Sequence, residues 1–351
     1  MNKIVFSISL IVLSCSVFAQ SGGDNIYDFL NITNSARVAS LGGQHISHPD
    51  SDLNFVYHNP SLLTSEMGNS LVLNYISYFA GTNFGYVGYS PNLNKKLNLA
   101  AGLHYLNYGE FIEADPTGQK TGTFRAADYA LNIYASKTLL DSTLSIGLTF
   151  KPIYSQLESY SSFGIAFDAG ITYYNKEKLF TAALVIKNAG VQLTRYNASQ
   201  PREPLPFEIQ LGISKRLRHA PFRFSVTGHQ LQKPNLLYET EQDKEERIDP
   251  ITGEEKQEDK LGQFADNFMR HVIFGVEFIP SENFYINLGY NYKRRQELKI
   301  EDKVGMVGFS FGAGIKISKF RISYGRSTYH LAGASNHFSV MVNLSEFGNK
   351  L

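Results

Sequence analysis

The stretch Leu144-Ser145-Ile146-Gly147-Leu148-Thr149-Phe150-Lys151 decides the fold class. Large apolar side chains alternate with small or polar ones, so in an extended chain the apolar ones all point to one side. The same period of two recurs at roughly strand length between turn residues, for example over 163–172, 207–214 and 309–318. No segment after residue 50 keeps an apolar stripe of helical period over three turns. The sequence therefore predicts an all-β protein.

Fourteen segments show this alternation, and each runs for about 8 to 12 residues, the length that a tilted strand needs to cross a membrane. Their expected first residues are Leu71, Asn83, Leu97, Asp128, Leu144, Ser162, Leu179, Pro206, Phe222, His271, Phe284, Val307, Phe320 and His337. Alternation alone fits both a membrane barrel and a soluble sandwich, because both hide one face of every strand.

The lengths of the connections separate these two architectures. Six even-numbered links are expected to be short, at 91–96, 140–143, 175–178, 218–221, 280–283 and 318–319. Four odd-numbered links are expected to be long, at 109–127, 187–205, 231–270 and 295–306, while the first link near 80–82 is short. Outer-membrane barrels have short periplasmic turns and longer outer loops, and an even strand count returns both chain ends to the periplasm. We therefore favour an antiparallel outer-membrane β-barrel over a secreted soluble β-protein.

Composition leaves both a soluble globular protein and a membrane β-barrel open, because the average hydropathy of such a barrel also resembles that of a soluble protein. The chain has 351 residues, of which 43% are hydrophobic and 19% charged, and 33 Lys and Arg balance 32 Asp and Glu. A nucleic-acid partner, which needs a broad basic face, is therefore not expected. No apolar run reaches the roughly 20 residues of a membrane-spanning helix, so a helical membrane bundle is not expected either.

The N-terminus has the pattern of an export signal. Lys3 precedes the apolar stretch 4–13, and a cleavage site of the small-residue type ends at Ala19. We therefore expect a signal peptide over 1–19. The alternative is a lipoprotein signal that acylates Cys15. Cleavage after Ala19 removes the single cysteine of the chain, which leaves neither a disulfide nor a thiol nucleophile.

Residues 20–70 lack the alternation, and we expect either a plug in the barrel mouth or a periplasmic appendage, ahead of a barrel over 71–351. Small residues on the expected inward faces leave room for a plug or for a narrow channel. They are Gly102, Gly147, Gly164, Gly212 and Gly312.

The sequence contains no G-x-x-x-x-G-K-[ST], H-E-x-x-H or C-x-x-C motif, and its one G-x-S-x-G match, at 308–312, lies in an alternating segment without the helix that follows a nucleophile elbow. His45 and His48 lie near Asp50 and Asp52, which is a possible metal-ligand grouping, but the spacing is common and the segment is not evidently helical. The stretch 312–314, Gly-Ala-Gly, lacks the following helix of a phosphate loop. We therefore predict no metal site and no cofactor.

Three further polar residues, His104, Asp168 and His229, fall on expected inward faces. Nothing in the sequence brings them together with a nucleophile, so we predict no catalytic residues and no enzymatic activity. The acidic stretch 239–260 does not follow the ligand spacing of a calcium loop, and we expect a solvated outer loop there.

Several blocks of the sequence resemble one family. They are 22–30 (GGDNIYDFL), 34–43 (NSARVASLGG), 58–63 (HNPSLL), 202–214 (REPLPFEIQLGIS) and 219–224 (HAPFRF). Together they resemble the PorQ family, outer-membrane proteins of the type IX secretion system in Bacteroidota, over essentially the whole mature chain. The pattern Ala36-Arg37, Leu41-Gly42-Gly43 and Asn59-Pro60 is less specific, because it is shared with FadL-like and PorV-like barrels.

The resemblance implies a non-enzymatic barrel in the cell outer membrane, with long loops facing the exterior. PorQ-like barrels are linked to the machinery that attaches secreted proteins to surface lipopolysaccharide, together with PorU and PorV, and most directly as a membrane holder for PorZ. The expected partners are therefore outer-membrane lipid and these proteins. The alternative is a FadL-like channel for small hydrophobic molecules, which the shared N-terminal pattern and the small luminal residues suggest. An outer-membrane hydrolase is the third and least favoured interpretation.

Overall fold

The computed structural model describes residues 25–78, 81–93, 97–139, 143–237, 260–298, 305–330 and 333–348. The expected signal peptide over 1–19 lies outside these residues, as does nearly all of the acidic stretch 239–260. No helix in the described ranges is both long and apolar enough to span a membrane.

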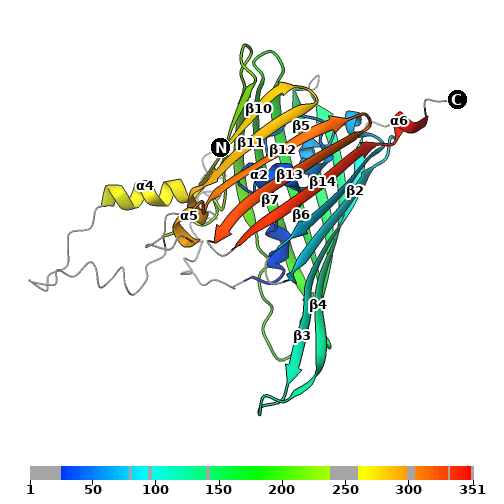
Figure 1. Cartoon of the computed structure of the whole chain (residues 1–351), viewed down its shortest axis with the longest axis vertical. Helices are drawn as coiled ribbons and strands as arrows, with labels where there is room; N and C mark the ends of the chain where they lie inside the picture. The colour runs from blue at the N-terminus through cyan, green and yellow to red at the C-terminus, as the bar shows by residue number, and fades with distance from the viewer. Residues whose placement is uncertain are drawn as a thin grey trace, which may run out of the picture. The chain divides into compact units, whose positions relative to one another are not determined.

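Fourteen antiparallel strands form one closed barrel, in which each strand pairs with its neighbours in sequence and β1 pairs with β14 (Figure 1). The strands are β1 (Ser70–Ser77), β2 (Asn83–Ser90), β3 (Asn98–Ala114), β4 (Lys120–Leu139), β5 (Leu144–Leu157), β6 (Tyr160–Asn175), β7 (Phe180–Thr194), β8 (Glu208–Arg216), β9 (Phe222–Gly228), β10 (Val272–Ser281), β11 (Phe284–Asn291), β12 (Phe309–Ile317), β13 (Phe320–His330) and β14 (Gly333–Asn343). Closure leaves no strand edge unpaired around the ring. The prediction of a fourteen-stranded antiparallel barrel is confirmed.

Two of the expected long links are partly strand. Strand β7 runs to Thr194, within the link expected over 187–205. In the link expected over 109–127, β3 continues to Ala114 and β4 already begins at Lys120. The two strands pair along this whole extension, for example Phe111 with Phe124. Side chains on both faces of this extension are exposed, so no buried face imposes an apolar alternation there. We call residues 110–125 the outer hairpin.

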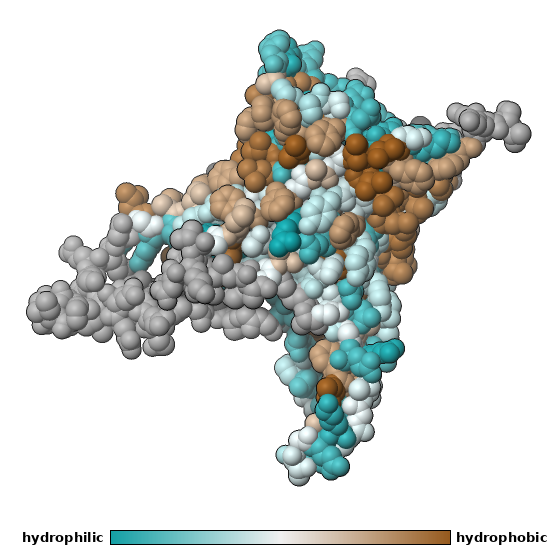
Figure 2. Space-filling view, viewed as in Figure 1, coloured by the Kyte–Doolittle hydropathy of each residue, from teal (hydrophilic) through white to brown (hydrophobic). Residues whose placement is uncertain are grey.

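The outer surface of the barrel is apolar. The outward side chains of Leu148, Phe167 and Leu211 are 61%, 48% and 51% exposed, and exposed aliphatic and aromatic side chains recur on strands around the ring. Figure 2 shows part of this apolar surface on one face of the barrel. The intervening residues, such as Thr149 and Gln210, are buried inside. Water would not tolerate an apolar surface of this extent, whereas lipid hydrocarbon does, so the chain is an outer-membrane β-barrel. We call this surface the lipid belt.

The two ends of the barrel differ. The short turns β4–β5, β6–β7, β8–β9, β10–β11 and β12–β13 share one end with the start of β1 and the end of β14. This is the periplasmic end, by the usual arrangement of such barrels. The longer connections after β7, β9 and β11 lie at the other, outer end, together with the outer hairpin.

Residues 25–69 lie inside the barrel, and we call them the plug. They contain four short 3-10 helices and one α-helix, η1 (Asp28–Asn31), α2 (Ala36–Ser40), η2 (Leu53–Tyr57), η3 (Pro60–Leu62) and η4 (Ser65–Met67). Helix α2 packs against β11 to β14, and η3 packs against β4, β5 and β6. Plug side chains such as Leu30, Phe55 and Tyr57 are fully buried. Of the two arrangements expected for this segment, the structure has the plug.

The described residues contain three further helices, α4 (Lys260–Arg270), α5 (Tyr292–Leu298) and α6 (Ser345–Gly348), of which α5 contacts the plug through Arg294. The expectation that no helical stripe follows residue 50 was therefore wrong for α4. Its apolar residues Leu261, Phe264 and Phe268 recur at helical spacing within a connection that we had expected to be a loop.

Candidate functional site: the plug and the outer hairpin

The glycines on the luminal wall make room for the plug. A Cβ atom at Gly147 would lie closer than 3.0 Å to the backbone of Pro60 and Ser61, and one at Gly212 would lie 2.6 Å from Ile46. Gly164 similarly faces Tyr27, and Gly312 faces Ser40, both closer than 3.0 Å. The fifth expected glycine, Gly102, accommodates the Tyr86 ring of the neighbouring strand instead. Interiors are packed without spare volume, so a larger residue at these positions displaces the plug.

The plug has local features that fit it to the wall. Gly42 and Gly43 both have φ of 98°, a left-handed conformation that glycine adopts without strain. The amide of Asn59 donates to Ile46 O at 2.7 Å and to Thr172 Oγ1 on β6 at 2.9 Å. Its side-chain oxygen accepts from Ser61 N at 3.0 Å, which caps η3. Gly42, Gly43 and Asn59 therefore help to hold the plug in its place against the wall.

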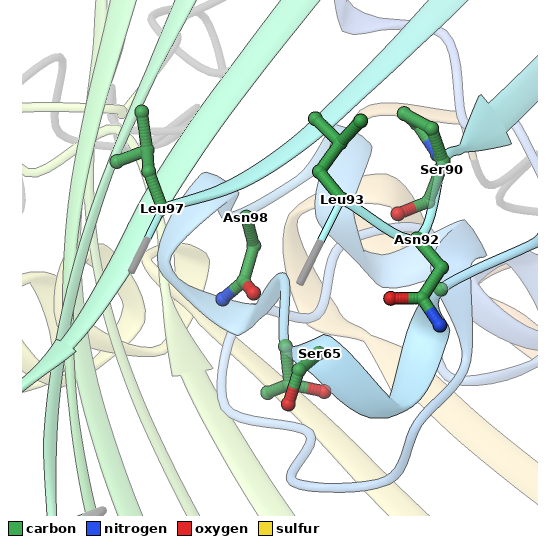
Figure 3. Close-up of a pocket in the computed structure, with 9 residues that line it drawn as sticks. Ser65, Ser90, Asn92, Leu93, Leu97 and Asn98 are labelled. Carbon is green, nitrogen blue, oxygen red and sulfur yellow. The ribbon is translucent and has the colours of Figure 1, made fainter. Parts of the chain in front are cut away.

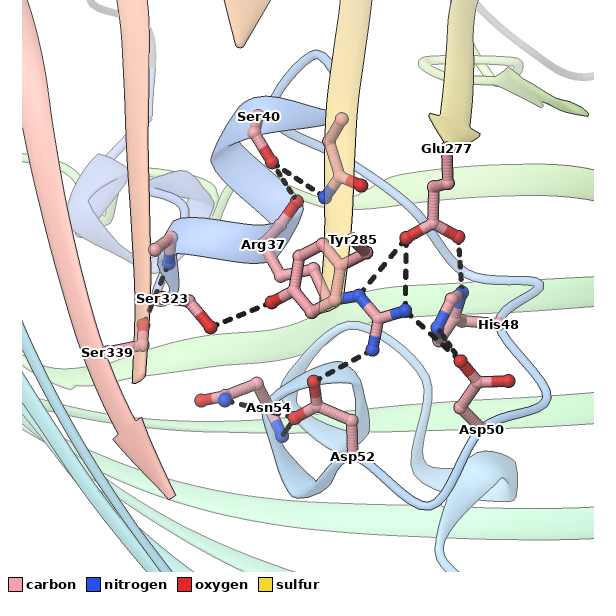
Figure 4. A network of polar contacts seen from close by, with 12 residues as sticks. Arg37, Ser40, His48, Asp50, Asp52, Asn54, Glu277, Tyr285, Ser323 and Ser339 are labelled. Carbon is pink, nitrogen blue, oxygen red and sulfur yellow. Dashed lines mark hydrogen bonds and ion pairs between the residues drawn. The ribbon is translucent and has the colours of Figure 1, made fainter. Parts of the chain in front are cut away.

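A largely buried group of charged side chains joins the plug to the wall, and Figure 4 shows Arg37, His48, Asp50, Asp52 and Glu277 of this group. We call it the charge cluster, and it consists of Arg37, His48, Asp50 and Asp52 from the plug, Arg223 from β9 and Glu277 from β10. Sequence reasoning pointed to Arg37 only as part of a family pattern. It missed Arg223 and Glu277, although both stand at inward positions of alternating strands, where a charge predicts a luminal partner.

Arg37 is the centre of the charge cluster. Its guanidinium contacts Glu277 at 3.1 Å, Asp50 at 3.1 Å and Asp52 at 3.3 Å. It also stacks over the ring of Tyr285, with 4.2 Å between Cζ and the ring centroid. The Arg37 side chain is only 3% exposed, so its charge depends on these partners rather than on water. Arg37 is the only Lys or Arg in the plug.

Arg223 provides the second cation. It contacts Asp50 Oδ1 at 2.7 Å and Glu277 Oε2 at 3.0 Å, while the imidazole of His48 lies 3.0 Å from Asp50 Oδ2. Two guanidinium groups thus face three carboxylates, and each of these five groups contacts at least one group of opposite charge. These ion pairs hold residues 37–52 of the plug against β9 and β10.

The residues considered for a metal site take part in these ion pairs or pack beside them. His48, Asp50 and Asp52 contact guanidinium groups, and His45 packs edge-on against His48 with 5.4 Å between ring centroids. Within the described ranges, no group of three or more His, Cys, Asp or Glu is placed to hold a metal ion.

The other three polar residues are also luminal. His104 lies 3.0 Å from the hydroxyl of Tyr57, and Asp168 pairs with Lys151 at 2.6 Å. His229 contacts Glu208 at 3.8 Å. The stretch 312–314 lies within β12, as a strand and not as a phosphate loop.

A small cavity lies beside the short connection from β2 to β3, between the plug and the wall (Figure 3). Its volume is about 40 Å³, and its lining includes Ser65, Asn92 and Asn98. This is room for one or two water molecules and not for an organic ligand.

The outer hairpin extends beyond the ring of paired strands. The pairing of β3 with β2 ends at Asn107, and the pairing of β4 with β5 begins at Ala126. Each arm adds roughly 24 Å of extended chain past that point. Its apolar residues include Phe111 and Ile112, which are 40% and 58% exposed. The outer hairpin is therefore a free two-stranded surface at the outer end.

The tip of the outer hairpin is ordered by one carboxylate. Asp115 Oδ1 accepts from the backbone N–H of Thr117 and of Gln119, each at 2.9 Å. The hydrogen bond from the Thr117 hydroxyl, followed by these backbone bonds, lowers the pKa of the Asp115 carboxyl. Gly118 supplies the left-handed residue of the turn, with φ of 84°.

No protein-family model matches the sequence, and no curated protein matches it. Among solved structures, the monoaromatic hydrocarbon channel CymD has 12% identity and a TM-score of 0.49, over 90% of this chain and 97% of that one. A TodX monoaromatic hydrocarbon channel mutant has 11% identity and a TM-score of 0.45, over 89% and 97%. A Pseudomonas aeruginosa FadL homologue has 10% identity and a TM-score of 0.45, over 89% and 98%. The closed barrel is established by the strand pairing of this chain itself.

Proposed function

We propose that this chain is a plugged outer-membrane barrel that holds a partner protein at the cell surface, as a docking component of the type IX secretion attachment machinery. The observation that carries the proposal is the filling of the lumen by the plug. Wall glycines such as Gly147 and Gly212 leave space only for plug atoms, and the charge cluster fastens the plug to β9 and β10. A barrel with a filled lumen acts through its outer surface.

The outer hairpin supports the docking part of the proposal. Its strands carry exposed apolar side chains and leave backbone edges open beyond Asn107 on β3 and before Ala126 on β4. Open strand edges bind extended segments of other proteins by adding a strand. The ordered tip at Asp115 keeps the two arms together before a partner arrives, which lowers the entropic cost of binding.

The identity of the partner rests on the family resemblance. PorQ-like barrels are linked most directly to PorZ, so PorZ is the partner that we propose, with PorU and PorV as neighbours in the same machinery. No residue with a catalytic role is carried over by the resemblance, and we propose a non-enzymatic protein.

Co-purification tests this function. The tagged full chain is extracted in mild detergent and compared with a variant in which residues 110–125 are replaced by a two-residue turn. We expect PorZ to be recovered with the intact chain and to fall at least tenfold with the variant, while heat-modifiable gel mobility shows that both barrels assemble. A Lys319→Ala variant in the short periplasmic turn is the matched control. Absence of PorZ from the intact chain, or equal recovery with the shortened hairpin, would contradict the proposal.

The second candidate is a channel for small hydrophobic molecules, with the plug as its gate. The names of the similar solved structures, monoaromatic hydrocarbon channels and a FadL homologue, fit this candidate rather than the first. The structural feature that bears on it is the charge cluster, because the ion pairs that hold the plug to β9 and β10 would have to separate before a path through the lumen opens.

Native mass spectrometry of the same preparation separates the two candidates. A bound lipid or other hydrophobic molecule, with no protein partner, favours the channel. A bound attachment subunit favours docking.

A further inference from the structure

Helix α4 is attached to the rest of the protein through its polar side. The Asn267 side chain accepts from Leu236 N and donates to Pro234 O, each at 2.8 Å. The hydroxyl of Tyr292 on α5 donates to Asp266 at 2.6 Å, and Arg270 pairs with Asp266 at 2.8 Å. These contacts fix the orientation of the helix about its own axis.

The opposite side of α4 carries its large apolar residues, and they point away from the protein. Leu261, Phe264 and Phe268 are 78%, 69% and 58% exposed, among the highest values for apolar residues in the described ranges. An amphipathic helix on a soluble protein turns its apolar side inward. Here the polar side is bound and the apolar side is outward, so the medium that covers α4 is itself apolar.

The lipid belt reaches the base of this helix. Strand β10 follows α4 almost directly, and Phe274, four residues after the end of the helix, is 37% exposed on the outer wall. Leu231, which follows β9 and donates its N–H to Ile209 O of β8, is 42% exposed. Figure 1 shows α4 projecting sideways from the outer end of β10. The apolar side of α4 therefore continues the membrane-facing surface of the barrel.

We propose that α4 is an interfacial helix that lies in the outer leaflet of the membrane, with Leu261, Phe264 and Phe268 inserted among the lipid chains. Interfacial helices bury their apolar side about 5–10 Å below the headgroups. The belt residue Phe274 lies only four residues after the end of α4, so the helix ends at the outer rim of the lipid belt. The helix then anchors the long connection between β9 and β10 to the membrane surface.

Fluorescence of a single tryptophan tests the insertion. The chain contains no tryptophan, so a Phe264→Trp variant carries one reporter. The full-length variant is reconstituted in phosphatidylcholine vesicles with or without bromine on the acyl chains. Phe224→Trp in the lipid belt is the positive control, and Thr117→Trp at the hairpin tip is the aqueous control. Heat-modifiable mobility shows that each variant is folded.

We expect brominated lipid to quench the Phe264→Trp reporter several-fold more than the Thr117→Trp reporter, with an emission maximum close to that of Phe224→Trp. Emission at the position of the aqueous control, together with quenching by iodide in the vesicles, would overturn the proposal and leave a protein partner as the occupant of this surface.

Discussion

Removal of the Arg37 guanidinium is expected to loosen the plug without preventing barrel closure. In an Arg37→Ala variant, Glu277, Asp50 and Asp52 each lose one contact of 3.1 to 3.3 Å in a buried setting. Strand pairing is untouched, because Arg37 lies in the plug and not in a strand. The effect should therefore appear in the plug first.

The size of the effect follows from what remains. Removing one partner of a buried ion pair costs about 3–5 kcal/mol. Asp50 and Glu277 keep Arg223, Asp52 keeps its bonds from Asn54, and Asp50 is 35% exposed to water. We therefore expect the lower end of that range, about 3 kcal/mol, which corresponds to a shift of roughly 100-fold in the equilibrium between docked and released plug.

Amide hydrogen exchange of peptides within 25–69 measures this equilibrium in the full chain. We expect exchange to accelerate by roughly 100-fold in Arg37→Ala and by less in Arg37→Lys, which keeps the charge but loses the planar fork. Arg125→Ala is the control, because its pair with Glu110 is 3.9 Å long and 80% exposed on the arginine side. Plug exchange that changes less than about threefold in Arg37→Ala would refute the reasoning about the charge cluster.

Other substitutions test the glycine contacts, the lipid belt and the hairpin tip. Gly147→Ala should weaken the docking of the plug by about 1–3 kcal/mol and speed amide exchange within 25–69. Gly85→Ala is the control, because the nearest atom to its added Cβ would be 3.9 Å away. Equal exchange in the two variants would contradict the close contact between Gly147 and the plug. Leu148→Arg, at a lipid-facing position, should lower the free energy of urea unfolding by about 2–4 kcal/mol if residue 148 is near the midplane. Ile112→Arg on the outer hairpin should leave it nearly unchanged. Equal losses of stability would show that both side chains face the same medium. Asp115→Ala should speed trypsin cleavage of the outer hairpin on intact cells and leave barrel unfolding unchanged. Unchanged cleavage would show that Asp115 does not order the tip.

The sequence predicted most of the strands because lipid and lumen impose opposite demands on neighbouring residues. Leu148 and Thr149 illustrate this, one exposed on the outer wall and the other buried inside. The alternation disappears where neither medium acts, and for that reason the outer hairpin was expected to be a loop. Residues such as Phe111 and Ile112 are both exposed there, so no period of two marks the strand.

The functional features were harder to predict because they join distant parts of the chain. Arg37 and Glu277 are 240 positions apart, and Arg223 and Asp50 are 173 apart, so no local pattern connects them. The segment 20–70 lacked periodicity, which left a plug and an appendage equally open. Only the luminal glycines held information about the choice, because their lack of a side chain is what the close approach of the plug requires.

Conductance of the purified protein in planar lipid bilayers tests the central claim most directly, since that claim is a lumen filled by residues 25–69. We expect the intact chain to insert without stable open-channel current across the usual voltage range, and the Arg37→Ala variant to show current steps as its plug is released. Stable ohmic conductance of the intact chain, equal to that of the variant, would contradict a filled lumen and the docking function built on it.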